Sequence, residues 1–159
     1  MTTAVDTNAF LALLYDDDEH ADASEAALRR AYRDGAVVAS PVVYAELAAD
    51  GRFDSAADLD RFLADFSVDV AEPSCEARFA AGERFREYVD RRPDGVQCPA
   101  CGEKRSADCE ACGESLSPRQ HIAADFLIGA HAALDCDGLV SFDEGFYSTY
   151  FPSLVVYPA

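Results

Sequence analysis

Short apolar runs alternate with longer amphipathic stretches along the whole chain. The apolar runs predict strands at residues 2–5, 36–39, 68–70, 139–141 and 154–156. Between them, apolar residues recur at helical spacing, which predicts helices at residues 7–15, 20–33, 42–49, 55–66, 74–92, 119–134 and 143–150. Strands that alternate with helices predict an α/β fold with a parallel sheet and right-handed crossovers.

Several of these helices carry recognisable start and stop signals. Ser40 precedes Pro41, which is the arrangement of an N-cap followed by a proline at the first helical position. Ser117 and Pro118 precede the helix at 119–134 in the same way, and Asp54 or Ser55 can cap the helix at 55–66. These signals fix where the chain turns between strand and helix.

The chain has 159 residues, which predicts one domain covering 1–159. Residues 96–117 differ in composition, because they are rich in Cys, Gly, Glu and Ser and poor in apolar residues. They are expected to form a small insertion within the domain. No apolar run approaches the ~20 residues that span a bilayer, and the first residues read as a strand rather than as a signal peptide. A soluble, cytoplasmic protein is therefore expected.

Four acidic residues are predicted to meet at one edge of the sheet. Asp6 follows the first strand, and Asp143 follows the strand at 139–141. Glu46 lies on the helix after the second strand, and Asp125 lies among apolar neighbours on the helix at 119–134. Ligands of an open parallel sheet bind at the carboxyl ends of its strands. Converging carboxylates repel each other unless a cation lies between them, so the pattern predicts a hard divalent metal and hydrolysis of a phosphodiester or related bond.

Each of these acids has a simpler explanation when it is taken alone. An aspartate after a strand is most often a helix cap, and a glutamate in a helix is usually solvated. Four acids from four separated segments that point to one sheet edge are harder to explain by chance. The metal-site hypothesis therefore depends on the whole set.

Four segments of the chain resemble the PIN-domain ribonucleases. They are Val5-Asp6-Thr7-Asn8, Tyr44-Ala45-Glu46-Leu47, the stretch 124–132 and the stretch 141–146. The likeness is nearest to the toxin subunits of VapBC toxin–antitoxin pairs and covers nearly the whole chain except the cysteine-rich segment. It implies a three-layer α/β/α fold with a central parallel sheet of four to five strands.

The resemblance also implies an activity and a site. It implies Mg²⁺- or Mn²⁺-dependent cleavage of single-stranded RNA that leaves a 5′-phosphate and a 3′-hydroxyl, with metal-binding roles for Asp6, Glu46, Asp125 and Asp143. It implies that Asn8 and Ser141 orient the site through hydrogen bonds. The implied partners are RNA, a small antitoxin protein and a second copy of the chain. Asp6→Asn is then expected to abolish cleavage and leave the fold intact.

Two other interpretations stay open. The protein could be an RNA-processing PIN endonuclease that uses its cysteine-rich segment to guide RNA, or a non-catalytic binding module whose acids serve only solubility. Growth arrest on expression, relieved by a neighbouring antitoxin gene, would favour the toxin. The aromatic residues Phe146, Tyr147, Tyr150 and Phe151 are expected in the core rather than as a platform on which RNA bases stack.

The cysteine-rich segment contains two CxxC motifs, each followed by glycine. Their four cysteines are Cys98, Cys101, Cys109 and Cys112. Two such motifs predict a closed tetrahedral zinc site of structural type. The alternatives are a pair of disulfides or free thiols, although disulfides are rare inside cells. The insertion could contact RNA, a partner or another subunit. Cys75 and Cys136 stand apart and are expected in the core.

The charge of the chain is strongly negative, with 30 acidic and 13 basic residues and a net charge of −17. This composition resembles that of proteins from salt-loving archaea. At low salt such a surface repels nucleic acid. At 1 M ionic strength the Debye length is only about 3 Å, so the repulsion is largely screened. The charge therefore argues only weakly against an RNA substrate.

Overall fold

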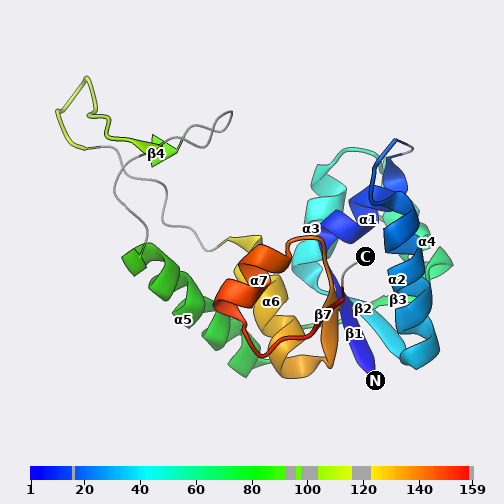
Figure 1. The fold of residues 1–159 in the computed structure, drawn as a ribbon. Helices are drawn as coiled ribbons and strands as arrows, with labels where there is room; N and C mark the ends of the chain where they lie inside the picture. The colour runs from blue at the N-terminus through cyan, green and yellow to red at the C-terminus, as the bar shows by residue number, and fades with distance from the viewer. Residues whose placement is uncertain (16, 92–95, 98–103, 116–122, 158–159) are drawn as a thin grey trace.

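The computed structural model describes residues 1–15, 17–91, 96–97, 104–115 and 123–157. Its centre is a parallel sheet of five strands in the order β3-β2-β1-β6-β7 (Figure 1). The strands are β1 (Thr2–Val5), β2 (Ala36–Ala39), β3 (Val68–Val70), β6 (Gly138–Val140) and β7 (Val156–Tyr157). The predicted parallel α/β fold is thus confirmed, with the larger of the two expected strand numbers.

Strand β1 lies in the middle of the sheet, between β2 and β6. Val5 at its carboxyl end is the register partner of Val140 at the end of β6. The N–H of Asp6 continues this pairing with a hydrogen bond of 3.0 Å to the carbonyl of Val140. The residues that follow β1 and β6 are therefore neighbours at one edge of the sheet.

Helices cover both faces of the sheet, with α2 on one side and α6 on the other, and α5 packs against α6 (Figure 1). The helices are α1 (Thr7–Leu14), α2 (Ala21–Asp34), α3 (Pro41–Ala49), α4 (Ala56–Asp65), α5 (Cys75–Arg91), α6 (Ala124–Asp135) and α7 (Glu144–Tyr150). Successive residues of a strand point to opposite faces, and Thr3, Ala4 and Val5 are all buried. Among the described helices, none combines the length and apolar character needed to cross a bilayer.

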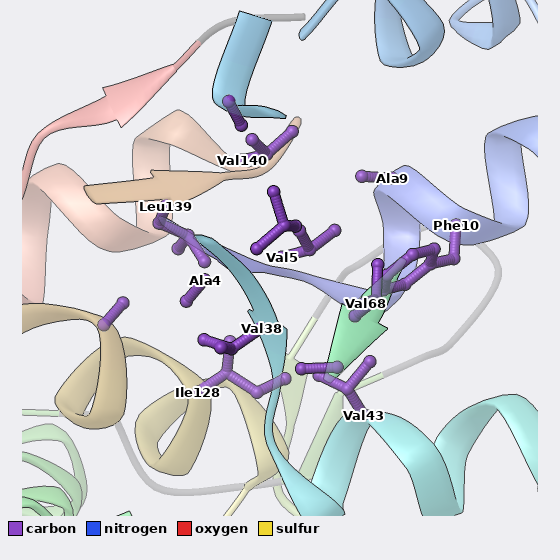
Figure 2. Close-up of a cluster of buried hydrophobic side chains, with 14 of the residues drawn as sticks. Ala4, Val5, Ala9, Phe10, Val38, Val43, Val68, Ile128, Leu139 and Val140 are labelled. Carbon is purple, nitrogen blue, oxygen red and sulfur yellow. The ribbon is translucent and has the colours of Figure 1, made fainter. Parts of the chain in front are cut away.

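The core forms where the central strands meet these helices (Figure 2). Val5 and Leu139 come from the sheet, while Phe10, Val43 and Ile128 come from helices. All five are almost fully buried. Burying one such side chain stabilises the fold by about 1.5–3 kcal/mol, so the core holds the carboxyl ends of β1 and β6 in a fixed register.

Side-chain caps fix the starts of the helices after the strands. Ser40 accepts a hydrogen bond from the N–H of Val43, and Pro41 is the first residue of α3, as predicted. Ser55 caps α4 through the N–H of Asp58. An N-cap side chain of this kind stabilises a helix by about 1 kcal/mol.

The structure corrects two predicted boundaries. The last strand was expected at residues 154–156 but is Val156–Tyr157, because the N–H of Leu154 bonds the carbonyl of Phe151 in a turn after α7. The helix expected from residue 119 begins at Ala124, since Ala123 has an extended backbone. Residues 117–118, which were expected to lead this helix, lie outside the described residues.

Two smaller findings concern packing on α5 and α6. Cys75 is exposed, so its predicted place in the core is wrong, while Cys136 is partly buried. A Cβ atom added at Gly129 would lie 2.4 Å from the ring of Phe151. Glycine at this position lets α6 approach the aromatic cluster of α7 and the turn after it.

Part of the cysteine-rich segment 96–117 is described. Strands β4 (Val96–Gln97) and β5 (Lys104–Arg105) form a separate two-stranded antiparallel sheet. Asp108 and Ser115 form an isolated antiparallel bridge. Cys98 and Cys101 lie outside the described residues, so the predicted four-cysteine site stays a prediction.

Candidate active site

An open pocket of about 500 Å³ contains all four of the predicted acids. The side chains of Asp6, Glu46, Asp125 and Asp143 line it together with Thr7, Asn8, Leu11, Ala49 and Asp50. The acids come from the ends of β1 and β6 and from helices α3 and α6. The folded chain therefore brings together four carboxylates that are far apart in the sequence.

Asp6 is the most firmly held of these acids. It is the N-cap of α1, and its Oδ1 accepts a hydrogen bond of 2.7 Å from the N–H of Thr7. Its Oδ2 accepts bonds from Asn8 Nδ2 at 3.0 Å, Ser141 Oγ at 2.7 Å and the Tyr147 hydroxyl at 3.0 Å. Its residue surface is only 4% exposed. These four donors fix both oxygens of the carboxylate.

The environment of Asp6 nevertheless raises its pKa. Loss of hydration on burial is the main cause, and the negative charge of Asp143 adds to it. The hydrogen bonds from Ser141, Tyr147 and Thr7 lower the pKa, but they offset only part of the effect. A nearby cation would favour the ionised form of such a buried carboxylate.

Asn8 and Ser141 connect the start of α1 to the segment after β6. Asn8 Nδ2 donates to Ser141 Oγ at 3.2 Å, and Asn8 Oδ1 accepts from the N–H of Phe142 at 3.2 Å. Ser141 Oγ also accepts from the N–H of Asp143 at 3.1 Å. These bonds set the position of Asp143 relative to Asp6. Asn8 lines the pocket, whereas Ser141 is buried behind it.

Asp143 is the N-cap of α7 and is exposed. Its Oδ1 accepts a hydrogen bond of 3.0 Å from the N–H of Phe146. The simpler role of this residue, capping a helix, is thus present in the structure. A cap leaves the carboxylate its charge, so this role and participation in the pocket are compatible.

Glu46 and Asp125 complete the acidic lining from two helices. Glu46 Oε2 accepts a hydrogen bond of 2.5 Å from the Thr7 hydroxyl. Asp125 lies in the first turn of α6, where the helix dipole favours a negative charge. Burial nevertheless raises the pKa of Asp125 to about 6, with further contributions from the charges of Asp6, Glu46 and Asp143. The negative charges of the other three acids therefore reach Asp125.

The pocket offers oxygen donors, which suit hard cations such as Mg²⁺ and Mn²⁺. Within the described residues, no group of three or more His, Cys, Asp or Glu side chains is arranged to hold a metal ion as it stands. Binding would require rotation of carboxylates such as that of the exposed Asp143. The donor chemistry fits a hard divalent cation, and a bound cation would oppose the rise that burial and the neighbouring acids cause in the pKa of Asp125.

Three residues of the site were not anticipated from the sequence. Tyr147 is fully buried, as expected of a core residue, but its hydroxyl also bonds Asp6. Thr7 bonds Glu46, and Asp50 lines the pocket. Helical spacing was the available signal for two of them, because Tyr147 lies four residues after Asp143 and Asp50 lies four after Glu46.

Fold and site together define a parallel α/β protein with an acidic pocket at the carboxyl ends of its strands. The sequence pattern of the PIN-domain family matches residues 3–152, so the chain belongs to that family. PIN domains are typically nucleases.

Two solved structures with the same fold are toxin–antitoxin complexes. One is VapBC2 from Rickettsia felis bound to a DNA fragment from its promoter, whose matching chain has 18% sequence identity to this chain and a TM-score of 0.61. The other is VapBC-1 from nontypeable Haemophilus influenzae, whose matching chain has 15% sequence identity to this chain and a TM-score of 0.59. In both cases the match covers 99% of this chain and 98% of the other chain. At these identities the likeness is one of fold. No curated protein matches the chain significantly.

Proposed function

We propose that this PIN-domain protein is a metal-dependent endoribonuclease that hydrolyses phosphodiester bonds of RNA in the cytoplasm. The observation that carries the proposal is the shared pocket, which is lined by carboxylates from four separated segments and in which burial and the charges of the other three raise the pKa of Asp125. A pocket with this charge would repel a phosphodiester unless a cation is bound with it. The non-catalytic alternative explains Asp6 as the N-cap of α1 but not why Glu46, Asp125 and Asp143 line the same pocket.

In this proposal each residue has a defined task. Asp6, Glu46, Asp125 and Asp143 would hold Mg²⁺ or Mn²⁺ and the phosphodiester would bind beside them. When bound, the ion lowers the pKa of a coordinated water and neutralises charge that develops on the phosphate. Asn8 and Ser141 keep Asp6 and Asp143 in a fixed relative orientation through their hydrogen bonds. Tyr147 and Thr7 hold the acids from behind.

The test is cleavage of a labelled single-stranded RNA in molar salt with Mg²⁺ or Mn²⁺. Asp125→Asn and Asp143→Asn are the informative variants, because neither removes the buried hydrogen bonds of Asp6, and asparagine is itself a good N-cap at position 143. Asp65→Asn, on the exposed end of α4, is the matched control. Loss of cleavage in both pocket variants but not in the control is expected. Full cleavage by both pocket variants in a preparation free of contaminating nucleases would refute the proposal.

The structure argues against relying on Asp6→Asn alone. Asp6 accepts four hydrogen bonds through its two oxygens. The amide of asparagine would place a donor where one or more donors already point, at a cost of about 1–3 kcal/mol for each unsatisfied buried group. A loss of activity in this variant could then result from unfolding as well as from loss of a catalytic carboxylate.

We further propose that the protein is the toxin of a VapBC-type pair, with a small antitoxin as partner and a dimer as its assembly. The support is the matching fold of the two VapBC complexes over nearly the whole chain. The cysteine-rich insertion favours a second candidate, an RNA-processing endonuclease that uses the insertion to guide RNA. Growth arrest on expression of the wild type, but not of Asp125→Asn, and its relief by the neighbouring gene would support the toxin. Healthy growth with an active enzyme would support RNA processing.

We also propose that Cys98, Cys101, Cys109 and Cys112 bind a structural Zn²⁺ ion. The described half of this set has the turn that such a site needs. The Cys109 thiol accepts hydrogen bonds from the backbone N–H groups of Ala111 and Cys112, which lower its pKa. Gly113 has a positive φ of 74° and donates a hydrogen bond of 2.7 Å to the carbonyl of Cys109.

The position of both CxxC motifs in the sequence supports the same site. The second motif lies between Asp108 and Ser115, which form an antiparallel bridge. The first motif lies in sequence between β4 and β5, which pair with each other. Each motif is thus enclosed by a short antiparallel pair. A closed site of four thiolates would stabilise a segment that has few apolar residues with which to form a core.

A further inference from the structure

Arg52, Tyr15 and Asp50 form a compact polar unit beside the acidic pocket. The guanidinium carbon of Arg52 lies 3.8 Å from the centre of the Tyr15 ring. Arg52 Nε lies 3.4 Å from Asp50 Oδ2, and the Tyr15 hydroxyl donates a hydrogen bond of 2.8 Å to Asp50 Oδ1. Tyr15 ends α1 and Asp50 ends α3, so the unit connects the ends of two helices that both contribute to the pocket.

The unit lies next to the pocket, because Asp50 lines the pocket together with the four acids. Among the described residues, six other arginines pair with acids on α2, α4, α5 and the segment before α5, and none of those acids lines the pocket. Arg52 does not itself line the pocket, but its ion pair with Asp50 places it next to the pocket wall.

The environment of Asp50 explains why the arginine is held there. Asp50 Oδ2 is buried and has no hydrogen-bond partner among the described residues. The positive charge of Arg52 compensates this oxygen at 3.4 Å. The side chain of Arg52 is 42% exposed while that of Asp50 is 15% exposed, so the arginine faces outward and the acid faces inward.

An arginine in this state suits the binding of a phosphate. Its guanidinium carries five N–H donors in a rigid plane, and Nε lies 3.4 Å from Asp50 Oδ2 in an ion pair without a hydrogen bond. Stacking on an aromatic ring holds the plane without using its donors. Arginine binds phosphate through two parallel hydrogen bonds. The pocket itself is acidic, so a polyanionic substrate needs a cation of this kind at its edge.

We propose that Arg52, positioned by Tyr15 and Asp50, binds a backbone phosphate of the RNA next to the one that is cleaved. This inference rests on the proposed ribonuclease function and assigns the protein a substrate-binding residue. Arg52 holds the strand along the pocket wall formed by the ends of α1 and α3, and it takes no part in the hydrolysis.

The test compares Arg52→Gln with Arg61→Gln in cleavage of the same single-stranded RNA oligonucleotide. Arg61 is the matched control, since it is an exposed arginine in an ion pair on α4 and its loss changes the net charge equally. Arg52→Gln is expected to raise KM about tenfold and to change kcat much less, as for loss of one charge-assisted contact. The slope of log KM against log salt should fall by about 1. Arg52→Lys should restore only part of the affinity, because lysine lacks the planar fork.

A second variant separates phosphate binding from a change in Asp50. Removing Arg52 leaves the charge of Asp50 uncompensated, which could by itself repel RNA. The double variant Asp50→Asn/Arg52→Gln removes both charges. A raised KM that persists in the double variant supports direct binding, and a return to the wild-type KM overturns it.

The remaining outcomes distinguish this inference from the function on which it rests. Cleavage by the wild type, with Arg52→Gln indistinguishable from Arg61→Gln in KM and salt slope, would overturn the role of Arg52 alone. A wild-type protein that cleaves no RNA with either metal would refute the ribonuclease function, and the role of Arg52 with it.

Discussion

The hydroxyl of Tyr147 donates a hydrogen bond of 3.0 Å to Oδ2 of Asp6, across 141 positions of the sequence. The phenol is fully buried, and its environment raises its pKa far above the usual range through burial and then through the charge of Asp6. Tyr147 is therefore a neutral hydrogen-bond donor at neutral pH. Its bond stabilises the ionised form of Asp6 and connects α7 to the start of α1.

Tyr147→Phe is expected to raise the pKa of Asp6 further, because one of the bonds that lowers it is lost. The acidic limb of the pH–rate profile should then move to higher pH, and the free energy of unfolding should fall by about 1 kcal/mol. Tyr150→Phe, on the same helix, is the control. An acidic limb that stays in place would show that Tyr147 acts only in packing.

The raised pKa of Asp125 predicts that this residue destabilises the fold at neutral pH. Its pKa is about 6 in the folded protein against an ordinary value of 3.8. Between these values the folded state binds more protons than the unfolded state, so the free energy of unfolding falls as pH rises from about 4 to 6. Above pH 6 this loss is complete, and below pH 4 it is absent.

Asp125→Asn removes the charge and should therefore be more stable than the wild type at pH 7 when no divalent cation is added. We expect a gain of about 1 kcal/mol after allowance for screening by solvent. Denaturant unfolding at pH 7 and pH 4 measures it, and the gain should disappear at pH 4. A variant that is less stable than the wild type at pH 7 would contradict the arrangement of charges described for the pocket.

The proposed zinc site predicts one Zn²⁺ ion per chain, measured by elemental analysis of the purified protein. Cys109→Ser and Cys112→Ser should each lose the ion, because a closed tetrahedral site needs all four thiolates. Cys75→Ser is the control, since Cys75 is an exposed cysteine at the start of α5. After chelation and return to excess Mg²⁺ or Mn²⁺, RNA cleavage should still be measurable if the zinc site is only structural. A protein without zinc, with four titratable thiols in the insertion, would rule the site out.

The net charge of −17 predicts that stability depends strongly on salt. Raising KCl from about 0.1 to 2 M shortens the Debye length from about 10 Å to less than 3 Å and screens repulsion between surface acids. Thermal unfolding should therefore shift to higher temperature over this range. The Asp125→Asn variant should gain less than the wild type, because one of its repelling charges is already gone. A melting temperature independent of salt would show that the acidic surface is not self-repelling.

The sequence by itself determined the local elements and the edge at which the acids meet. Ser40 with Pro41 fixed the start of α3, and the apolar runs fixed the strands, because caps and hydrophobic periodicity act over a few residues. Asp6 and Asp143 could be placed at one edge, since each follows a buried strand of a parallel sheet. The boundaries of the last strand and of α6 were wrong, because tertiary contacts and backbone turns decide where such short elements end.

Only the tertiary structure decided which side chains support the acids. Tyr147 and Thr7 bond Asp6 and Glu46 across long stretches of sequence, and no local pattern carries that information. The place of Asp50 at the pocket wall, and with it that of Arg52, depends on how α1 packs against α3. Hydrogen bonds and ion pairs between distant segments form only when the packed core has set the distances between them, and for that reason they had to be read from the structure.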